Sequence, residues 1–280
     1  MSISILNNVT SLAAQNSLSM TQASLQKTLQ QLSTGSRLNT GADDAAGLAI
    51  ADGLNANISA LKQSAHNASD GIGSLQVADG ALSQVTALLN RAVTLATEAS
   101  TGTVSDTQRT TINAEFTAIK AEIDSIGSTT NYNGAQVFSA TATAVYLSDG
   151  TSGGASSITV TTGALSSSAI GFSGTPVSLG GNDLTSVTNA KAALTNITSA
   201  IAGVAADRGA LGAEMNRLQA ASSVMSNEVQ NLTTAADNIR AADIPSAVSS
   251  MSRLTVLQQT GMAALQQSNQ MQQSVLKLLQ

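Results

Sequence analysis

Residues 54–99 read LNANISALKQSAHNASDGIGSLQVADGALSQVTALLNRAVTLATEA, and an apolar residue stands at every seventh position of this stretch. That series is Leu54, Leu61, Ala68, Leu75, Leu82, Leu89 and Ala96. A companion series slips once, between Ile72 and Ala78, but stays on the same side of a helix. Apolar heptads sustained over this length are typical of long helices that pack along coiled-coil-like seams.

The second half of the chain repeats the pattern. Seven consecutive heptad positions are apolar there: Ala190, Ile197, Val204, Leu211, Leu218, Met225 and Leu232. Arg208 and Ser222 interrupt the paired series. Since each helical residue adds about 1.5 Å, a helix of about 45 residues is about 70 Å long. The predicted fold class is mainly α, a long coiled-coil-like helical rod built from the N- and C-terminal halves.

A third, shorter helix is predicted after Ser105. Gln108 follows this serine at the spacing of a capping box. The turn-rich residues 127–134, GSTTNYNG, end the helix. Between these limits runs an apolar stripe with helical spacing, formed by Ile112, Phe116, Ile119, Ile123 and Ile126.

The middle of the chain has a different character. Between Gly150 and Asn182 there is no charged residue, and Ser, Thr and Gly dominate. Two β-like runs, residues 144–147 and 157–162, are candidates for a hairpin joined by a turn at residues 148–150. We expect a small β-rich or irregular central segment, and a disordered Gly/Ser linker is the alternative.

Composition argues against catalysis. Charged residues make up 10% of the chain and aromatic residues 2%, whereas enzyme pockets usually need ionisable groups and aromatic walls. His66 is the only histidine and there is no cysteine, so neither a metal site nor a cofactor is expected. We interpret Asp43 and Asp44 as helix-capping residues rather than as a catalytic pair. No enzymatic activity is predicted.

The charge pattern and the apolar stretches exclude two further classes. The net charge is −5 and there is no run of basic residues, so nucleic acid is not an expected partner. The apolar stretches are much shorter than the ~20 residues that a membrane span needs. The chain also begins without the basic and apolar regions of a cleaved signal peptide.

The two ends of the chain match each other. Residues 1–36 carry one charged side chain, Lys27, and residues 241–280 carry only Asp243, Arg253 and Lys277. Both ends nevertheless place apolar residues at helical spacing. Alone in water, such helices bury too little surface to offset the entropy lost on ordering. We therefore predict that both ends become ordered when many copies assemble. The apolar residues are Leu18, Leu25, Leu29 and Leu32, then Ile244, Val248, Met251, Leu254, Leu265, Val275 and Leu279.

Several stretches resemble bacterial flagellins. Residues 25–47, LQKTLQQLSTGSRLNTGADDAAG, resemble the N-terminal signature of that family. The C-terminal stretches MSR at 251–253, LQQTG at 257–261 and VLKLLQ at 275–280 resemble the family's other end, and GIGSLQ at 71–76 and NYNG at 131–134 also fit. The resemblance covers about residues 1–138 and 184–280.

The resemblance implies a subunit that polymerises into the flagellar filament. The implied division is an N-terminal filament-core arm (1–43), rod helices (44–138), a short outer segment (139–183), a C-terminal rod helix (184–236) and a C-terminal core arm (237–280). The implied filament-core assembly residues are Leu25, Leu29, Leu32, Arg37, Ile244, Val248, Met251, Leu254 and Leu265.

The resemblance also implies a location and partners. The protein is expected outside the cell, after export by the flagellar type III route without a cleaved signal peptide. Besides itself, the implied partners are a flagellar secretion chaperone, a filament cap and hook-associated proteins.

A receptor site is implied as well. The family pattern read by the flagellin-sensing Toll-like receptor maps onto Asn90, Arg91, Leu95 and Glu115, with Asn90 standing where the family usually has Gln. The alternative is that Arg91 is a solvated residue with a contact in the filament. For the whole protein, the alternatives are a hook–filament junction protein and a secreted binding module or adhesin.

Overall fold

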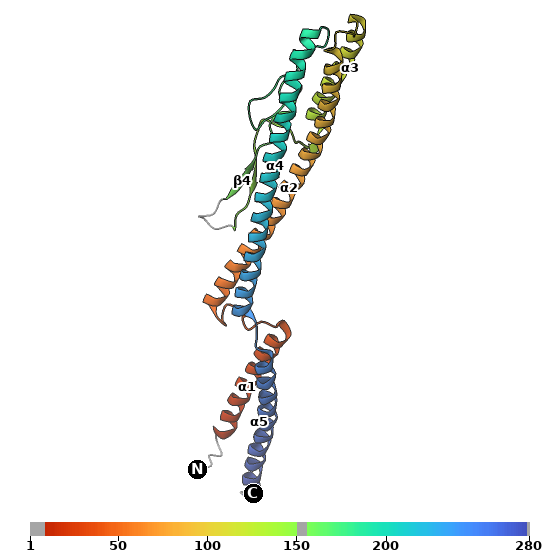
Figure 1. Cartoon of the computed structure of the whole chain (residues 1–280). Helices are drawn as coiled ribbons and strands as arrows, with labels where there is room; N and C mark the ends of the chain where they lie inside the picture. Colours follow the sequence, from red (N-terminus) through yellow and green to blue (C-terminus); the bar gives the residue numbers. More distant parts are fainter. Residues whose placement is uncertain (1–8, 150–155, 279–280) are drawn as a thin grey trace. The chain divides into compact units, whose positions relative to one another are not determined.

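The computed structural model describes residues 9–149 and 156–278, and the side chains of residues 275–278 are likewise left out. Val275 and Leu279 of the predicted apolar stripe therefore lie outside the described side chains. The chain forms two compact units, one from residues 1–55 with 231–280 and one from residues 56–230. The elements, in order, are α1 (Val9–Thr34), α2 (Ala45–Ala99), α3 (Asp106–Thr129), β1 (Asn131–Tyr132), β2 (Ala135–Gln136), β3 (Thr143–Tyr146), β4 (Ser157–Val160), α4 (Val187–Arg240) and α5 (Ile244–Leu278). The mainly α fold class is confirmed (Figure 1).

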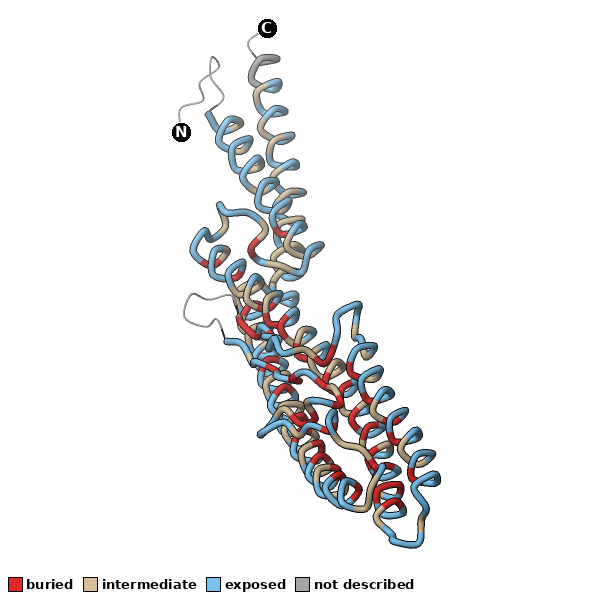
Figure 2. Tube along the Cα trace, turned by 90° about the horizontal axis from the view of Figure 1, so that it is seen from above, coloured by how far each residue is buried: buried red, intermediate tan, exposed pale blue. Residues whose placement is uncertain are grey.

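The core of the second unit lies along the heptad positions of α2 and α4. Leu75, Leu82 and Leu89 on α2 are fully buried. Ile197 and Leu218 on α4 are buried to the same degree. Figure 2 shows buried positions, in red, recurring along the long helices, as coiled-coil-like packing requires. The heptad prediction is thus confirmed within this unit.

An ion pair explains why Arg208 interrupts the second heptad series. Its guanidinium donates to both carboxylate oxygens of Asp79, with N···O distances of 2.7 and 3.2 Å. Asp79 lies on α2, so the pair joins the two long helices. Arg208 also holds the pKa of Asp79 below its usual range.

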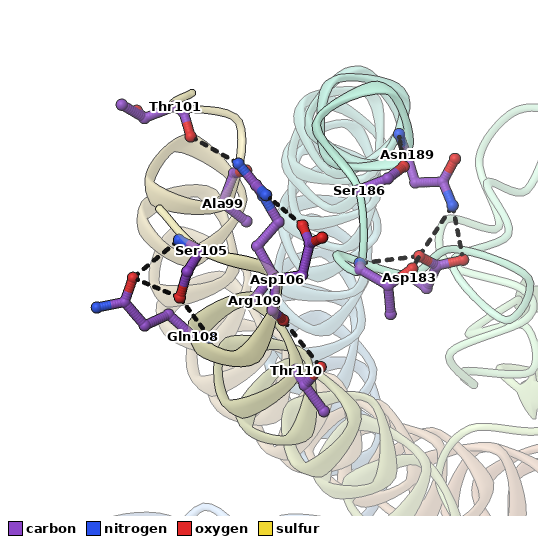
Figure 3. A network of polar contacts seen from close by, with 11 residues as sticks. Ala99, Thr101, Ser105, Asp106, Gln108, Arg109, Thr110, Asp183, Ser186 and Asn189 are labelled. Carbon is purple, nitrogen blue, oxygen red and sulfur yellow. Dashed lines mark hydrogen bonds and ion pairs between the residues drawn. The ribbon is translucent and has the colours of Figure 1, made fainter. Parts of the chain in front are cut away.

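The predicted capping box at Ser105 is present. The Ser105 hydroxyl accepts from the backbone N–H of Gln108, and the Gln108 side chain accepts from the backbone N–H of Ser105 (Figure 3). Arg109, one residue on, is buried and donates to the carbonyls of Ala99 and Thr101. The polar groups at the end of α2 and the start of α3 are thereby satisfied within one cluster.

Two short hairpins follow α3. Asn133 and Gly134, both with positive φ, join β1 to β2, which is the preferred chemistry of a two-residue hairpin. Strands β3 and β4 pair antiparallel, so the predicted hairpin of the central segment is confirmed. The predicted turn at residues 148–150 includes Gly150, which lies outside the described residues, and the backbone of Ser148 is bonded to Ser64 of α2. The Ser64 hydroxyl donates to the Ser148 carbonyl at 2.8 Å.

Side chains of the helices hold the rest of the central segment. Asp124 on α3 accepts from the backbone N–H of Ser167 at 2.6 Å. Asp207 on α4, which is 1% exposed, accepts from the backbone N–H groups of Phe172 and Ser173. Ile170, Leu179 and Leu184 are fully buried. The described part of this segment is therefore packed structure and not a free linker.

Candidate assembly interface

The first unit is built around the antiparallel pair α1 and α5. At the distal end, the hydroxyls of Thr10 and Ser268 lie 3.4 Å apart. At the other end, the backbone N–H of Ala242 donates to the Gly35 carbonyl at 2.9 Å. Between them, Gly261 lies beside Leu18, and a Cβ on this glycine would be 3.4 Å from the Leu18 Cδ1, close to ordinary van der Waals contact. Figure 1 shows the two helices side by side.

This helix pair has almost no closed core. Thr28, at 9% exposed, is the one buried residue of α1, and none of the described residues of α5 is buried. The apolar residues that face the partner helix are only half-buried: Leu18, Leu25, Leu32, Met251, Leu254 and Leu265. A helix pair that buries so little is weakly stabilised by itself.

Large apolar side chains are exposed mainly in this unit. Fourteen are exposed among the described residues, and eleven of them belong to the first unit, so this unit is the candidate surface for a partner. They are Val9, Leu12, Met20, Leu29, Ile50, Ile244, Val248, Val256, Leu257, Met262 and Met271. The other three, Val77, Tyr146 and Val224, belong to the second unit.

The predicted assembly residues, apart from Arg37, divide into two groups. Leu29, Ile244 and Val248 are exposed and available to another molecule. Leu25, Leu32, Met251, Leu254 and Leu265 are half-buried between the two helices. Arg37 belongs to neither group.

Sequence reasoning missed Leu12, Met20, Val256 and Met262. Leu12, Met20 and Val256 lie off the apolar stripe that we followed, whereas Met262 lies on it, about five helical turns after Ile244, and all four are exposed. The signal that was present in the sequence is the occurrence of large apolar residues on more than one face of nearly uncharged helices.

Arg37 joins the two ends of the chain. Its backbone N–H donates to the Arg240 carbonyl at 2.7 Å, and its Nε donates to the Ile239 carbonyl at 2.6 Å. Just before it, Gly35 has φ +67°, a left-handed conformation that ends α1. Arg37 thus fixes where α1 ends relative to the end of α4, rather than contributing to an apolar face.

Asp43 and Asp44 have different roles. Asp44 caps α2, because its carboxylate accepts from the backbone N–H of Gly47 at 2.9 Å. Asp43 instead lies 2.6 Å from the Lys27 ammonium group and accepts from the backbone N–H groups of Asn39 and Thr40. The capping prediction is confirmed for Asp44 and wrong for Asp43. Asp43 instead ties the loop between α1 and α2 to α1 through its ion pair with Lys27.

The Asp43 contacts predict a pH dependence. Lys27 and the two N–H donors hold the pKa of Asp43 well below its usual range. A lowered folded-state pKa stabilises the fold above the ordinary value of about 3.9, and this contribution is lost as the pH falls through the folded-state value. We expect Asp43→Asn to lower the thermal midpoint of the full chain at pH 7, and the gap from wild type to narrow below about pH 4. Thermal melting followed by circular dichroism measures the midpoints. A difference between wild type and Asp43→Asn that stays constant down to about pH 2.5 would contradict the prediction.

The candidate receptor residues lie in the second unit. Arg91 and Glu115 form a bidentate ion pair with N···O distances of 2.7 and 3.1 Å, and both side chains are about half exposed. Arg91 holds the pKa of Glu115 below its usual range. Asn90 is exposed, whereas Leu95 is 2% exposed and belongs to the core. The exposed side chains of this set are therefore polar.

Among the described residues, no helix is long and apolar enough to cross a membrane. That same part of the chain contains no cluster of three or more metal-ligating side chains.

Known proteins match both ends of the chain. Residues 5–143 match the family model of the bacterial flagellin N-terminal helical region, and residues 194–279 match that of the C-terminal helical region. A flagellin of Halalkalibacterium halodurans is 34% identical over 91% of both chains. The chain belongs to the bacterial flagellin family.

A second relative agrees with this assignment to the flagellins. A flagellin of Bacillus subtilis is 32% identical over 98% of both chains. The crystal structure of Bacillus cereus flagellin covers 62% of this chain and 93% of its own, at 25% identity and a TM-score of 0.47. As a flagellin, the protein is a structural subunit that polymerises into the extracellular filament of the bacterial flagellum. A junction protein or a separate binding module is not favoured.

Proposed function

We propose that the filament forms through the exposed apolar faces of α1 and α5. The observation that supports this is the concentration of exposed apolar side chains in the first unit, where almost nothing is fully buried. A fully buried Leu, Ile or Met stabilises a protein by about 1.5–3 kcal/mol relative to an exposed one. Contacts between neighbouring copies then bury the apolar side chains that the monomer leaves exposed to water.

The polar surface of the helix pair fits the same role. Besides the apolar residues, α5 presents mainly Gln, Asn and Ser, with one charged side chain, Arg253, among those described. Amide side chains can donate and accept at once, so they pair across an interface without burying a charge. A contact between unlike faces of identical subunits does not close on itself, so repeated addition builds a helical polymer.

The test is seeded growth of purified full-length chain, followed by electron microscopy. Wild type should give long uniform filaments. We expect Val256→Ser combined with Met262→Ser to raise the concentration needed for growth by at least about 10-fold, because two exposed apolar contacts are lost. Val224→Ser is the matched control, since Val224 is exposed at 64% but lies in the second unit.

Two outcomes would contradict the proposal. One is growth of the double variant at the wild-type concentration. The other is an equal loss of growth with Val224→Ser. Circular dichroism of each monomer separates a defect of assembly from a defect of folding.

A second proposed function is recognition by the flagellin-sensing Toll-like receptor at Asn90, Arg91 and Glu115. The exposed bidentate pair supports it, because an arginine held in one orientation costs little further entropy on binding. Leu95 would act by supporting the surface from beneath. Receptor signalling by monomer carrying Arg91→Ala, compared with Arg217→Ala on α4, tests this assignment.

The remaining partners are proposed from family membership. We propose that the chain is exported unfolded by the flagellar type III route, that a secretion chaperone holds α5 before export, and that a cap at the filament tip guides insertion. The weak burial of α5 supports the chaperone contact. Co-purification of the chaperone with the full chain but not with a chain lacking residues 244–278 would test it.

A further inference from the structure

A groove of about 750 Å³ lies in the second unit, between α2 and the two hairpins. Its size is within the range of sites for small molecules. Two glycines of α2 shape it by allowing the hairpins to approach. A Cβ at Gly71 would lie 2.9 Å from Val145, and a Cβ at Gly73 would lie 2.8 Å from the Tyr132 hydroxyl. The groove does not overlap the exposed apolar side chains of α1 and α5.

Both tyrosines of the chain line this groove. The protein has two tyrosines and no tryptophan, and Tyr132 and Tyr146 both belong to the groove wall. Tyr146 is 52% exposed, although a large ring gains free energy when it is covered. Val137 and Val145 add apolar surface to the same wall.

Polar groups around the rings have no partner. Within the described part of the chain, Asp70, Ser74 and the hydroxyls of Tyr132 and Tyr146 make no hydrogen bond, and Asp70 makes no ion pair. They provide one charged acceptor and three hydroxyls that can donate or accept. An apolar wall with a few convergent polar groups is the usual composition of a ligand site.

The chemistry of the lining selects the ligand. Asp70 is the one charged residue that lines the groove, so an anion is disfavoured. The face of an aromatic ring is electronegative and attracts polarised C–H groups, while the carboxylate attracts hydroxyl donors. An added peptide strand fits less well, because Asn67 already donates to the Tyr146 carbonyl at 3.2 Å.

We propose that this groove binds a neutral saccharide. A sugar ring has one face of C–H groups and a rim of hydroxyls, which match the exposed Tyr146 ring and the free acceptors of Asp70 and Ser74. The groove shares no residue with the proposed assembly face of α1 and α5, so failure of either proposal leaves the other standing.

The two tyrosines also provide the assay. Because no tryptophan is present, tyrosine emission of the full-length chain reports on this groove alone. The monomer is titrated with three neutral probes: cellotriose, mannotriose and the N-acetylglucosamine trimer. We expect a saturable change in emission with at least one of them. Tyr146→Ala should weaken binding by about 10-fold or more, Tyr146→Phe should keep it within about 3-fold because the ring remains, and Asp70→Asn should weaken it by about 5-fold.

Val224→Ala is the control, since this residue is exposed in the same unit but does not line the groove. Circular dichroism confirms that each variant is folded. The proposal is overturned if none of the three probes changes the tyrosine emission at concentrations up to about 10 mM. This concentration is well above the largest dissociation constant expected for such a site. It is also overturned if Tyr146→Ala binds as wild type does, or if an arginine-rich peptide saturates the groove and the sugars do not.

Discussion

Deletion of residues 241–280 is expected to abolish filament formation, even when filament fragments are supplied as seeds. The deletion removes α5, and with it the partner of α1 and six of the eleven exposed apolar side chains of the first unit, namely Ile244, Val248, Val256, Leu257, Met262 and Met271. Without α5, the half-buried leucines of α1 have nothing to pack against. We expect a soluble monomer in which α1 is largely unfolded, because an isolated helix of this kind is marginal in water.

The second unit provides the internal control for this deletion. Its core residues, such as Leu82 and Leu211, are contributed by α2 and α4 and do not depend on α5. Its thermal unfolding, followed by tyrosine emission, should be unchanged within about 2 °C, a shift smaller than that produced by 1 kcal/mol. Filaments grown from the truncated chain would contradict the proposed assembly mechanism. Loss of the second unit's transition would show that the truncation acts through misfolding.

The second large effect is expected from Gly127→Ala on α3. Replacing glycine by alanine inside a helix normally stabilises it by about 0.5–1 kcal/mol. Here Gly127 is buried, and the new Cβ would lie 2.0 Å from the carbonyl oxygen of Leu165, a backbone atom that cannot rotate away. We therefore expect Gly127→Ala to destabilise the protein instead, lowering the free energy of unfolding of the second unit by about 2–4 kcal/mol.

Gly209→Ala on α4 is the matched control. This glycine is exposed, and no atom lies within 4 Å of the position that a Cβ would take. The same substitution should therefore stabilise the chain by up to about 1 kcal/mol. Urea unfolding followed by tyrosine emission measures both variants. Equal effects in the two variants would mean that the contact between α3 and Leu165 is looser than described.

Several features of the candidate interface could be read from sequence. The apolar spacing of residues 18–32 and 244–265, together with the scarcity of charge, predicted two helices that bury little alone. The spacing did not predict which of these residues pack between α1 and α5 and which remain exposed. Leu25 and Leu29 belong to one stripe, yet the first is half-buried against α5 and the second is 45% exposed. The crossing of α1 and α5 decides that division, and it depends on contacts between residues more than 200 positions apart.

Elements with local causes could be predicted from the order of the amino acids alone. Heptad spacing specified the long helices and their buried faces, Ser105 and Gln108 specified the start of α3, and two β-like runs specified the β3–β4 pair. Each of these depends on side chains within a few turns of one another, so it leaves a periodic or positional signal.

Contacts between a side chain and a distant part of the backbone could be identified only in the folded chain. Asp43 holds a loop instead of capping a helix, Asp207 holds the backbone of Phe172 and Ser173, and Arg37 binds the end of α4. A carboxylate or guanidinium can satisfy any nearby N–H or carbonyl, whatever its distance along the chain. Such pairings follow from how the elements meet in space, and for that reason no spacing in the sequence predicts them.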